Sequence, residues 1–134
     1  MDRLKTRLEV AARALRTFEE VARLEQPSGV ERDAAIQRFE YTFEVTWKTL
    51  QQYLRDVEKL PAGSPRAVFR AGRDVELLSD AEAELALQMC DDRNLTVHTY
   101  DEALARHIYS HLGSYAELLR ACLRRIEERL ASSA

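Results

Sequence analysis

Four side chains able to act together on a phosphate group lie within eight residues of this chain. The guanidinium of Arg93 has the planar fork that fits phosphate oxygens, and His, the residue type at 98, is the side chain whose unperturbed pKa lies near neutrality. Asn94 adds a carboxamide and Tyr100 a phenol. RNA cleavage without a metal needs a base for the 2′-hydroxyl, an acid for the leaving oxygen and a cation beside phosphorus. These residue types therefore indicate metal-independent chemistry on RNA.

A single copy of the chain supplies only one imidazole in this segment, whereas the reaction needs both an acid and a base. A two-fold dimer that brings two such segments together would supply paired His98 and paired Arg93 side chains. The same residues also have a structural explanation, because Arg and His are favoured near the C-terminus of a helix by its dipole. A Tyr after a turn is often a packing residue. Residue types alone therefore leave catalysis and helix capping open.

Five helices are expected to position this segment. Apolar residues spaced three and four apart predict a first helix over residues 4–22 and a second over about 30–60. An N-cap Ser followed by Pro predicts a short third helix over 64–72. The tetrads Ser79–Glu82 and Thr99–Glu102 have the pattern of capping boxes and predict the starts of a fourth and a fifth helix. The chemistry-bearing segment would then span the end of the fourth helix, a turn and the start of the fifth.

Composition agrees with this helical reading. The chain has 134 residues, of which 46% are hydrophobic and 32% charged, and only four are Gly and three Pro. So few turn-forming residues favour long helices with short connections. No segment shows the sustained alternation of a strand. We predict one domain over residues 1–134, an all-α antiparallel bundle of four long helices plus one short helix.

The net charge of −3 implies that any contact with RNA must come from a local basic patch. Arg66, Arg70 and Arg73 fall at i, i+4 and i+7 and form such a stripe on the short third helix. The stripe could guide an RNA backbone or bind an acidic partner, and a solvated helix face explains it equally well. The sequence shows neither a secretion signal nor a membrane span, so we expect a cytoplasmic protein without membrane contact.

Four other residues have types that can bind metals. Cys90 and Cys122 fall inside apolar helical patterns, and we expect buried free thiols. His107 and His111 are four apart on the last helix, a spacing able to chelate a transition metal. Since no third ligand with recognisable spacing accompanies them, we expect ordinary helix residues. No Gly-rich phosphate loop is present, and we expect no cofactor and no metal site.

The chemistry-bearing segment resembles a known motif. Arg93, His98 and Tyr100 match the Arg-x4-His-x-Tyr pattern of the HEPN superfamily, small helical proteins that include many ribonucleases. A second resemblance is more specific and covers most of the chain. Together, this motif and the second resemblance, described next, imply a HEPN-like helical bundle that forms a homodimer.

Three blocks in this order resemble the nucleotidyltransferase substrate-binding protein family, a HEPN branch. They are Arg-Phe-Glu-Tyr-Thr-Phe-Glu-Val-Thr-Trp-Lys-Thr-Leu at 38–50, Ser-Pro-Arg at 64–66 and Asp-Asp-Arg-Asn-Leu-Thr-Val-His-Thr-Tyr-Asp at 91–101. The likeness extends from about residue 8 to residue 125. It implies a partner, a separate minimal nucleotidyltransferase that is usually encoded nearby.

In related toxin–antitoxin pairs, the HEPN member is an RNA endonuclease that the nucleotidyltransferase silences by adding AMP to the motif tyrosine. Carried over, this resemblance implies that Arg93 stabilises the scissile phosphate and that Asn94 orients the phosphate or the imidazole. His98 would be the acid and base, and Tyr100 the residue modified. A charged, bulky AMP two residues from His98 would exclude RNA by repulsion and volume.

The main hypothesis is therefore a metal-independent endoribonuclease toxin, with RNA as substrate, neutralised by AMP addition at Tyr100. The alternative is a non-catalytic subunit that binds a substrate or nucleotide for the nucleotidyltransferase. A third possibility is a helical scaffold in which the motif residues only cap a helix.

Overall fold

The computed structural model describes residues 2–132 and contains five α-helices in this range. A π-helical turn (η1) extends the second of them, and a 3₁₀ turn (η2) extends the fourth. The elements are α1 (Asp2–Glu19), α2 (Gly29–Tyr53), η1 (Leu54–Glu58), α3 (Pro65–Asp74), α4 (Asp80–Leu95), η2 (Thr96–His98) and α5 (Glu102–Ser132). The predicted fold class, four long helices and one short helix, is confirmed.

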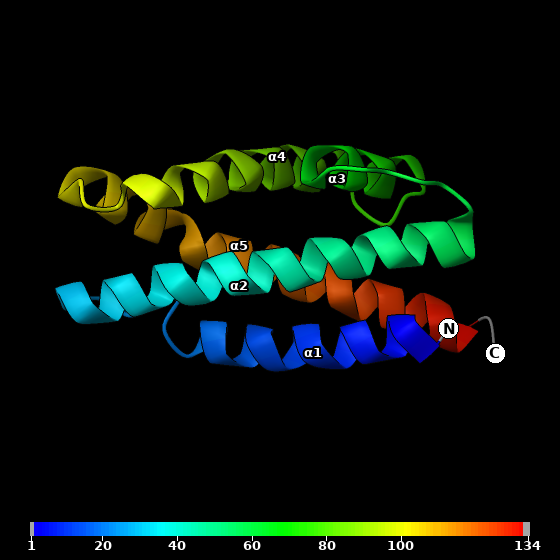
Figure 1. The fold of residues 1–134 in the computed structure, drawn as a ribbon, viewed down its shortest axis with the longest axis horizontal. Coiled ribbons are helices and arrows are strands. Elements are labelled where there is room, and N and C mark those ends of the chain that lie inside the picture. Colours follow the sequence, from blue (N-terminus) through cyan, green and yellow to red (C-terminus); the bar gives the residue numbers. More distant parts are fainter. Residues whose placement is uncertain (1, 133–134) are drawn as a thin grey trace.

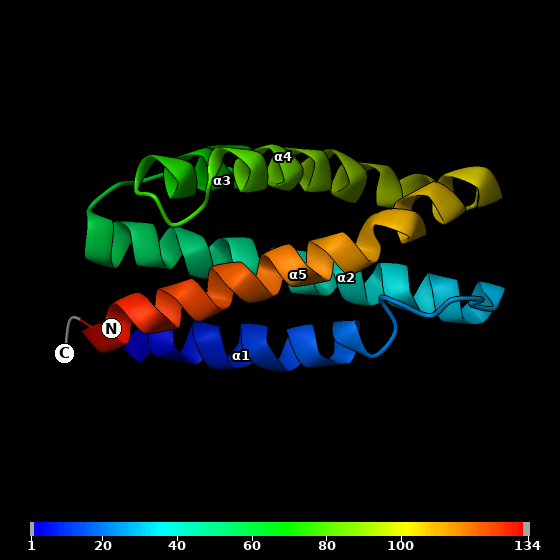
Figure 2. The same cartoon turned by 180° about the vertical axis from the view of Figure 1, so that it is seen from behind.

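The helices are arranged in layers, and consecutive long helices run in opposite directions (Figure 1). α2 and α5 form the middle layer, and α1 packs against both of them. α3 and α4 pack against each other on the opposite side of this layer from α1, as the reverse view also shows (Figure 2). The yellow segment that joins α4 to α5 lies at the same end of the bundle as the start of α2 (Figure 1).

The core between the layers is built on aromatic side chains. Phe39 on α2 is fully buried and its ring lies 5.9 Å from that of Phe18 on α1 and 5.5 Å from that of Tyr115 on α5. Phe43, one turn further along α2, contacts Phe69 on α3. Buried aromatic rings contribute both large apolar areas and favourable edge or offset contacts. α2 is thus the element that all the other layers pack against.

Two threonines of α2 add polar contacts to the packing against α1. The Thr42 hydroxyl donates to the carbonyl of Ala14 at 3.2 Å, and the Thr49 hydroxyl lies 3.3 Å from the carbonyl of Arg7. The Thr49 hydroxyl also lies 2.6 Å from the Val45 carbonyl of its own helix. Both threonine side chains are fully buried. Their short side chains let the two helices approach closely while their hydroxyls keep acceptors.

The second helix is shorter than the expected 30–60. Its α-helical part ends at Tyr53, and η1 continues the chain to Glu58. Lys59 then adopts a left-handed conformation with φ of 57°, and the amide of Leu60 donates to the Leu54 carbonyl at 2.9 Å. A left-handed residue after the last turn satisfies carbonyls that would otherwise lack donors, and it ends the helix. The third helix runs two residues past its expected end, to Asp74.

The capping box at Ser79 and Glu82 is confirmed, because each side chain accepts a hydrogen bond from the other residue's amide. The capping box expected at Thr99 is wrong. The Thr99 hydroxyl instead donates to the Thr96 carbonyl at 3.2 Å, and Asp101 accepts from the amide of Leu104. The physical reason is the 3₁₀ turn η2, which follows α4 directly and includes the residues just before Thr99. The last helix therefore begins only at Glu102, and Asp101 is its N-cap.

Candidate functional site

The four residues singled out in the sequence lie where α4 gives way to α5, and we call them the helix-end cluster: Arg93, Asn94, His98 and Tyr100. Arg93 and Asn94 belong to the last turn of α4, and His98 is the last residue of η2. Tyr100 lies in the turn before α5. In Figure 1 this segment is the yellow end of the bundle, above the cyan start of α2.

Arg93 is held against α2 and its own turn. Its Nη1 lies 3.6 Å from Oε2 of Glu40 and donates to the Thr96 hydroxyl at 3.1 Å. The same hydroxyl donates to the Arg93 carbonyl at 2.7 Å. Nε of Arg93 is buried and has no hydrogen-bond partner among the described residues. The guanidinium is thus positioned by Glu40 and Thr96, and it keeps an unused donor.

His98 and Tyr100 are brought together. Nδ1 of His98 lies 3.1 Å from the Tyr100 hydroxyl, and the two rings are nearly perpendicular with centroids 5.8 Å apart. Both side chains are exposed, Tyr100 by 81%. An imidazole at this distance can accept the phenol proton or donate to the phenol oxygen. This pair can therefore share a hydrogen bond at the surface.

The structure thus divides the predicted cluster into two parts. Arg93 pairs with Glu40 on another helix, whereas His98 pairs with Tyr100, and no hydrogen bond joins Arg93 to His98 within residues 2–132. Asn94 is exposed on the last turn of α4. The contact of Glu40 with Arg93 is visible only in three dimensions, because α3 and its connections separate α2 from α4 in the sequence.

Several apolar side chains near members of the cluster in the sequence, or next to the partner of Arg93, are exposed. Leu95 and Val97, which lie between its members in the sequence, are 39% and 70% exposed. Tyr41, next to Glu40 on α2, is 56% exposed. Exposed apolar residues that gather at one place are typical of a surface that another molecule covers.

The basic stripe is present but partly neutralised. Nη1 of Arg66 lies 2.6 Å from the carboxylate of Asp91, two residues before Arg93, and Arg73 lies 3.7 Å from Asp74. Arg70 is exposed. The pairing of Arg66 with Asp91 brings the start of α3 toward the last turns of α4. A role of the stripe in RNA or partner binding stays a prediction.

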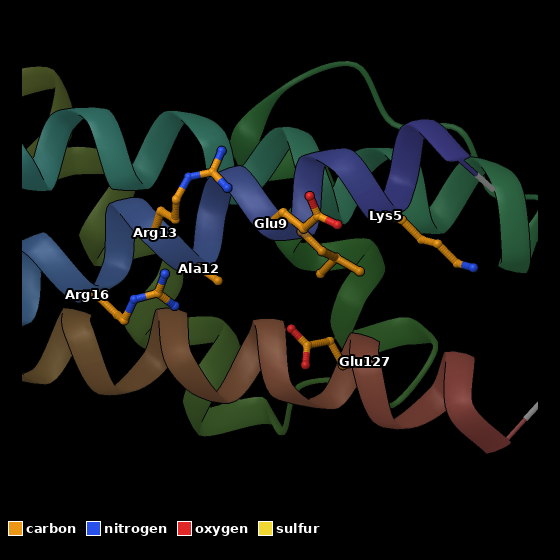
Figure 3. Close-up of a pocket in the computed structure, with 7 residues that line it drawn as sticks. Lys5, Glu9, Ala12, Arg13, Arg16 and Glu127 are labelled. Atoms are coloured by element: carbon orange, nitrogen blue, oxygen red, sulfur yellow. The ribbon is translucent and has the colours of Figure 1, made fainter.

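The surface hollows described in the structure lie away from the cluster. One of about 420 Å³ lies between α1 and α5, and its lining includes Arg13 and Arg16 from α1 and Glu127 from α5 (Figure 3). None of the five hollows has a residue of the helix-end cluster in its lining. The cluster is therefore a surface feature, without an enclosing pocket among those described.

Both cysteines are buried and free, as expected. Burial raises the pKa of Cys90 to about 11 and that of Cys122 to about 12. Neither thiol is placed to act as a nucleophile at neutral pH, because the thiolate is the reactive form.

The residues that could hold a metal ion lie between α4 and α5. Asp92 on α4 comes close to His107 and His111 on α5. The spacing of the two histidines did not indicate this third ligand, because it comes from a different helix.

No helix within residues 2–132 has the length and apolar character needed to cross a membrane.

Comparison with known proteins gives a family and two related folds. Residues 6–128 match the profile of a family described as nucleotidyltransferase substrate binding protein like. A crystal structure of a protein from Thermus thermophilus is 59% identical, with a TM-score of 0.86, over 87% of this chain and 98% of that one. Comparison with curated proteins gives no significant match.

A second solved structure, from Haemophilus influenzae, is described as showing the fold of a substrate binding domain of a nucleotidyltransferase. It is 24% identical, with a TM-score of 0.76, over 90% of this chain and 98% of that one. At this identity the likeness establishes the shared fold.

Proposed function

Since the chain belongs to the nucleotidyltransferase substrate-binding protein family, we propose that it is a non-catalytic subunit that binds a nucleotide or another substrate for a separate nucleotidyltransferase. The helix-end cluster is the proposed contact with the partner enzyme or with its substrate. Family membership and the setting of the cluster support this proposal over the endoribonuclease hypothesis.

The observation that carries the proposal is the open setting of the cluster. Tyr100 and Val97 are among the most exposed large hydrophobic residues of the described chain. Chemistry on a charged phosphate gains most from a site that excludes water and holds its charges in place. A surface that offers aromatic, apolar and Arg side chains together is instead typical of a contact with another molecule.

A second candidate is a metal-independent endoribonuclease toxin, neutralised when the nucleotidyltransferase adds AMP to Tyr100. The contact between His98 and Tyr100 favours it, because an imidazole 3.1 Å from the phenol can take its proton. Loss of that proton makes the phenol oxygen a better nucleophile, and its attack on the α-phosphate of ATP would form the Tyr–AMP bond, break the α–β phosphoanhydride bond and release pyrophosphate. RNA cleavage would in addition require a homodimer, because one chain brings one imidazole to the cluster.

Co-expression with and without the nucleotidyltransferase separates the two candidates, with intact-mass measurement and mapping of the Tyr100 peptide. The binding subunit predicts a stable complex, transfer to an external substrate that requires both proteins, and an unchanged mass. The toxin predicts a mass gain of one or more AMP units on the Tyr100 peptide. It also predicts RNA cleavage by the unmodified chain between about pH 6 and pH 8, where imidazoles exchange protons.

Matched variants sharpen this experiment. Tyr100→Phe and Tyr41→Phe each remove one hydroxyl from an exposed ring, so only the first should abolish AMP addition if Tyr100 is the acceptor. His98→Ala should abolish RNA cleavage if the toxin mechanism holds, and retained cleavage would contradict it. If the purified chain and the nucleotidyltransferase form no complex, the binding-subunit candidate fails; if the Tyr100 peptide gains no AMP, the toxin candidate fails.

A further inference from the structure

We propose that Asp92, His107 and His111 form a binding site for a divalent transition-metal ion such as Zn²⁺. Each residue offers one ligand atom, and these atoms all lie within 4.8 Å of one another. Asp92 comes from α4 and the two histidines from α5, so the ion would join these helices. The proposal does not depend on the proposed function, because none of the three residues belongs to the helix-end cluster.

The two histidines already have the arrangement of a chelating pair. They are four residues apart and therefore share one face of α5, and their ring centroids lie 4.9 Å apart. Two His one turn apart on a helix form the core of many zinc sites. Ligands bound at about 2.0–2.2 Å in tetrahedral geometry lie roughly 3.4 Å from one another. Small rotations of the two imidazoles would bring the present cluster to that spacing.

Asp92 supplies a reason for a cation to bind here. It is 5% exposed and is the only charged residue among the buried polar residues of the described chain. It forms no ion pair with any Lys or Arg within residues 2–132. A buried carboxylate is costly unless it is paired or coordinates a metal. A divalent ion held by the histidines would provide the missing positive charge.

Hydrogen bonds behind the proposed ligands hold them in place. The Tyr115 hydroxyl donates to Oδ2 of Asp92 at 2.5 Å, and the Gln88 amide donates to the Tyr115 oxygen at 3.0 Å. The same amide nitrogen lies 3.5 Å from Nδ1 of His111. Tyr115 is itself fully buried, so its phenol is held in this position. Such outer contacts orient ligands in known metal sites.

The site is open to solvent on one side. His107 is exposed and His111 is half-buried, whereas Asp92 lies beneath them. An ion could therefore enter from solution past His107. Three protein ligands would leave at least one coordination position for water or for a ligand atom of a bound molecule.

The test is calorimetric titration of Zn²⁺ into chelator-treated full-length protein, with Co²⁺ absorption spectra as a second measurement. We expect one ion per chain and a Co²⁺ spectrum of nitrogen and oxygen coordination. His107→Gln, His111→Gln and Asp92→Asn should each weaken the affinity at least tenfold. The control is His98→Gln, because His98 is the one other His of the chain and lies outside the site. Its affinity should equal that of the wild type.

Thermal unfolding distinguishes variants that lose the metal site from variants that lose the fold. Zn²⁺ should raise the Tm of the wild type and of His98→Gln but not that of the three ligand variants, each checked for native helix content. If Asp92→Asn does not fold, the His107→Gln and His111→Gln variants alone test the proposed site. The proposal fails if no ion binds at one per chain, or if the His107→Gln and His111→Gln variants retain wild-type affinity. It also fails if the Co²⁺ spectrum shows thiolate coordination, which would place the ion on a cysteine.

Discussion

Nη1 of Arg93, in the last turn of α4, lies 3.6 Å from Oε2 of Glu40 on α2. About a third of each side chain is exposed, at 29% and 35%. An ion pair so open to water is expected to contribute at most about 1 kcal/mol to stability. The pair therefore orients the guanidinium at the helix-end cluster more than it holds the fold together.

Arg93→Ala should consequently affect binding much more than stability. We expect the free energy of unfolding to fall by about 1 kcal/mol or less, while affinity for the nucleotidyltransferase or its substrate falls at least tenfold. Arg55→Ala is the control, because Arg55 is an exposed arginine in η1, outside the cluster. Urea denaturation and a titration of the partner measure the two effects. A loss of stability without a loss of binding would contradict the assigned role.

Phe39→Ala should strongly destabilise the bundle. Phe39 is fully buried between α1 and α5, in contact with Phe18 and Tyr115. Removing such a ring leaves a cavity and is expected to cost about 3–5 kcal/mol. Tyr41→Ala, two residues further along the same helix, should cost less than about 0.5 kcal/mol because its ring is exposed. Equal losses in urea denaturation would contradict the assigned core.

Glu82→Gln should destabilise the protein in a pH-dependent manner. The hydrogen bond from Arg125, aided by the Ser79 amide, lowers the pKa of Glu82 below its usual range. A carboxylate with a lowered pKa stabilises the folded state above the ordinary pKa of Glu, about 4.3, and this contribution is lost as the pH falls through the folded value. We expect a loss of about 1 kcal/mol at pH 7.

The difference in unfolding free energy between wild type and Glu82→Gln should shrink as the pH falls below about 4. Urea denaturation at several pH values measures it. Glu84→Gln is the matched control, since Glu84 is an exposed carboxylate of the same helix. A difference that persists at low pH would show that the charge of Glu82 is not its source.

The cysteines should resist alkylation while the protein is folded. Burial raises the pKa of Cys90 to about 11 and of Cys122 to about 12, so at pH 8 both are protonated as well as inaccessible. A thiol-reactive dye should label neither residue in buffer and both in denaturant. Rapid labelling of either thiol in the native protein would contradict its placement.

The helices and most of their boundaries follow from patterns within short stretches of sequence. The apolar spacing around Phe39 and the capping box at Ser79 act over a few residues, so they can be read without the fold. The capping role of Thr99 cannot be judged in this way, because whether a chain leaves α4 through a 3₁₀ turn depends on how that end packs. The pattern therefore predicts the cap at Thr99, whereas Asp101 forms it.

The candidate site is predictable only in part for a similar reason. His98 and Tyr100 are two residues apart, and their contact is local. Arg93 on α4 instead pairs with Glu40 on α2. In the same way, His107 on α5 has its proposed third metal ligand, Asp92, on α4. Contacts between helices depend on their relative placement, which periodicity along one helix does not specify.

The threonine contacts between α1 and α2 have a consequence for register. Sliding α1 along its axis by one turn, about 5.4 Å, would keep apolar faces together but would remove the Ala14 and Arg7 carbonyls from Thr42 and Thr49. Breaking the Thr42 bond would leave a buried hydroxyl without its acceptor on the other helix, at a cost of about 1–3 kcal/mol, whereas the Thr49 hydroxyl would keep the Val45 carbonyl. The Thr42 hydroxyl therefore favours the observed alignment of the helices over others that apolar packing alone would accept.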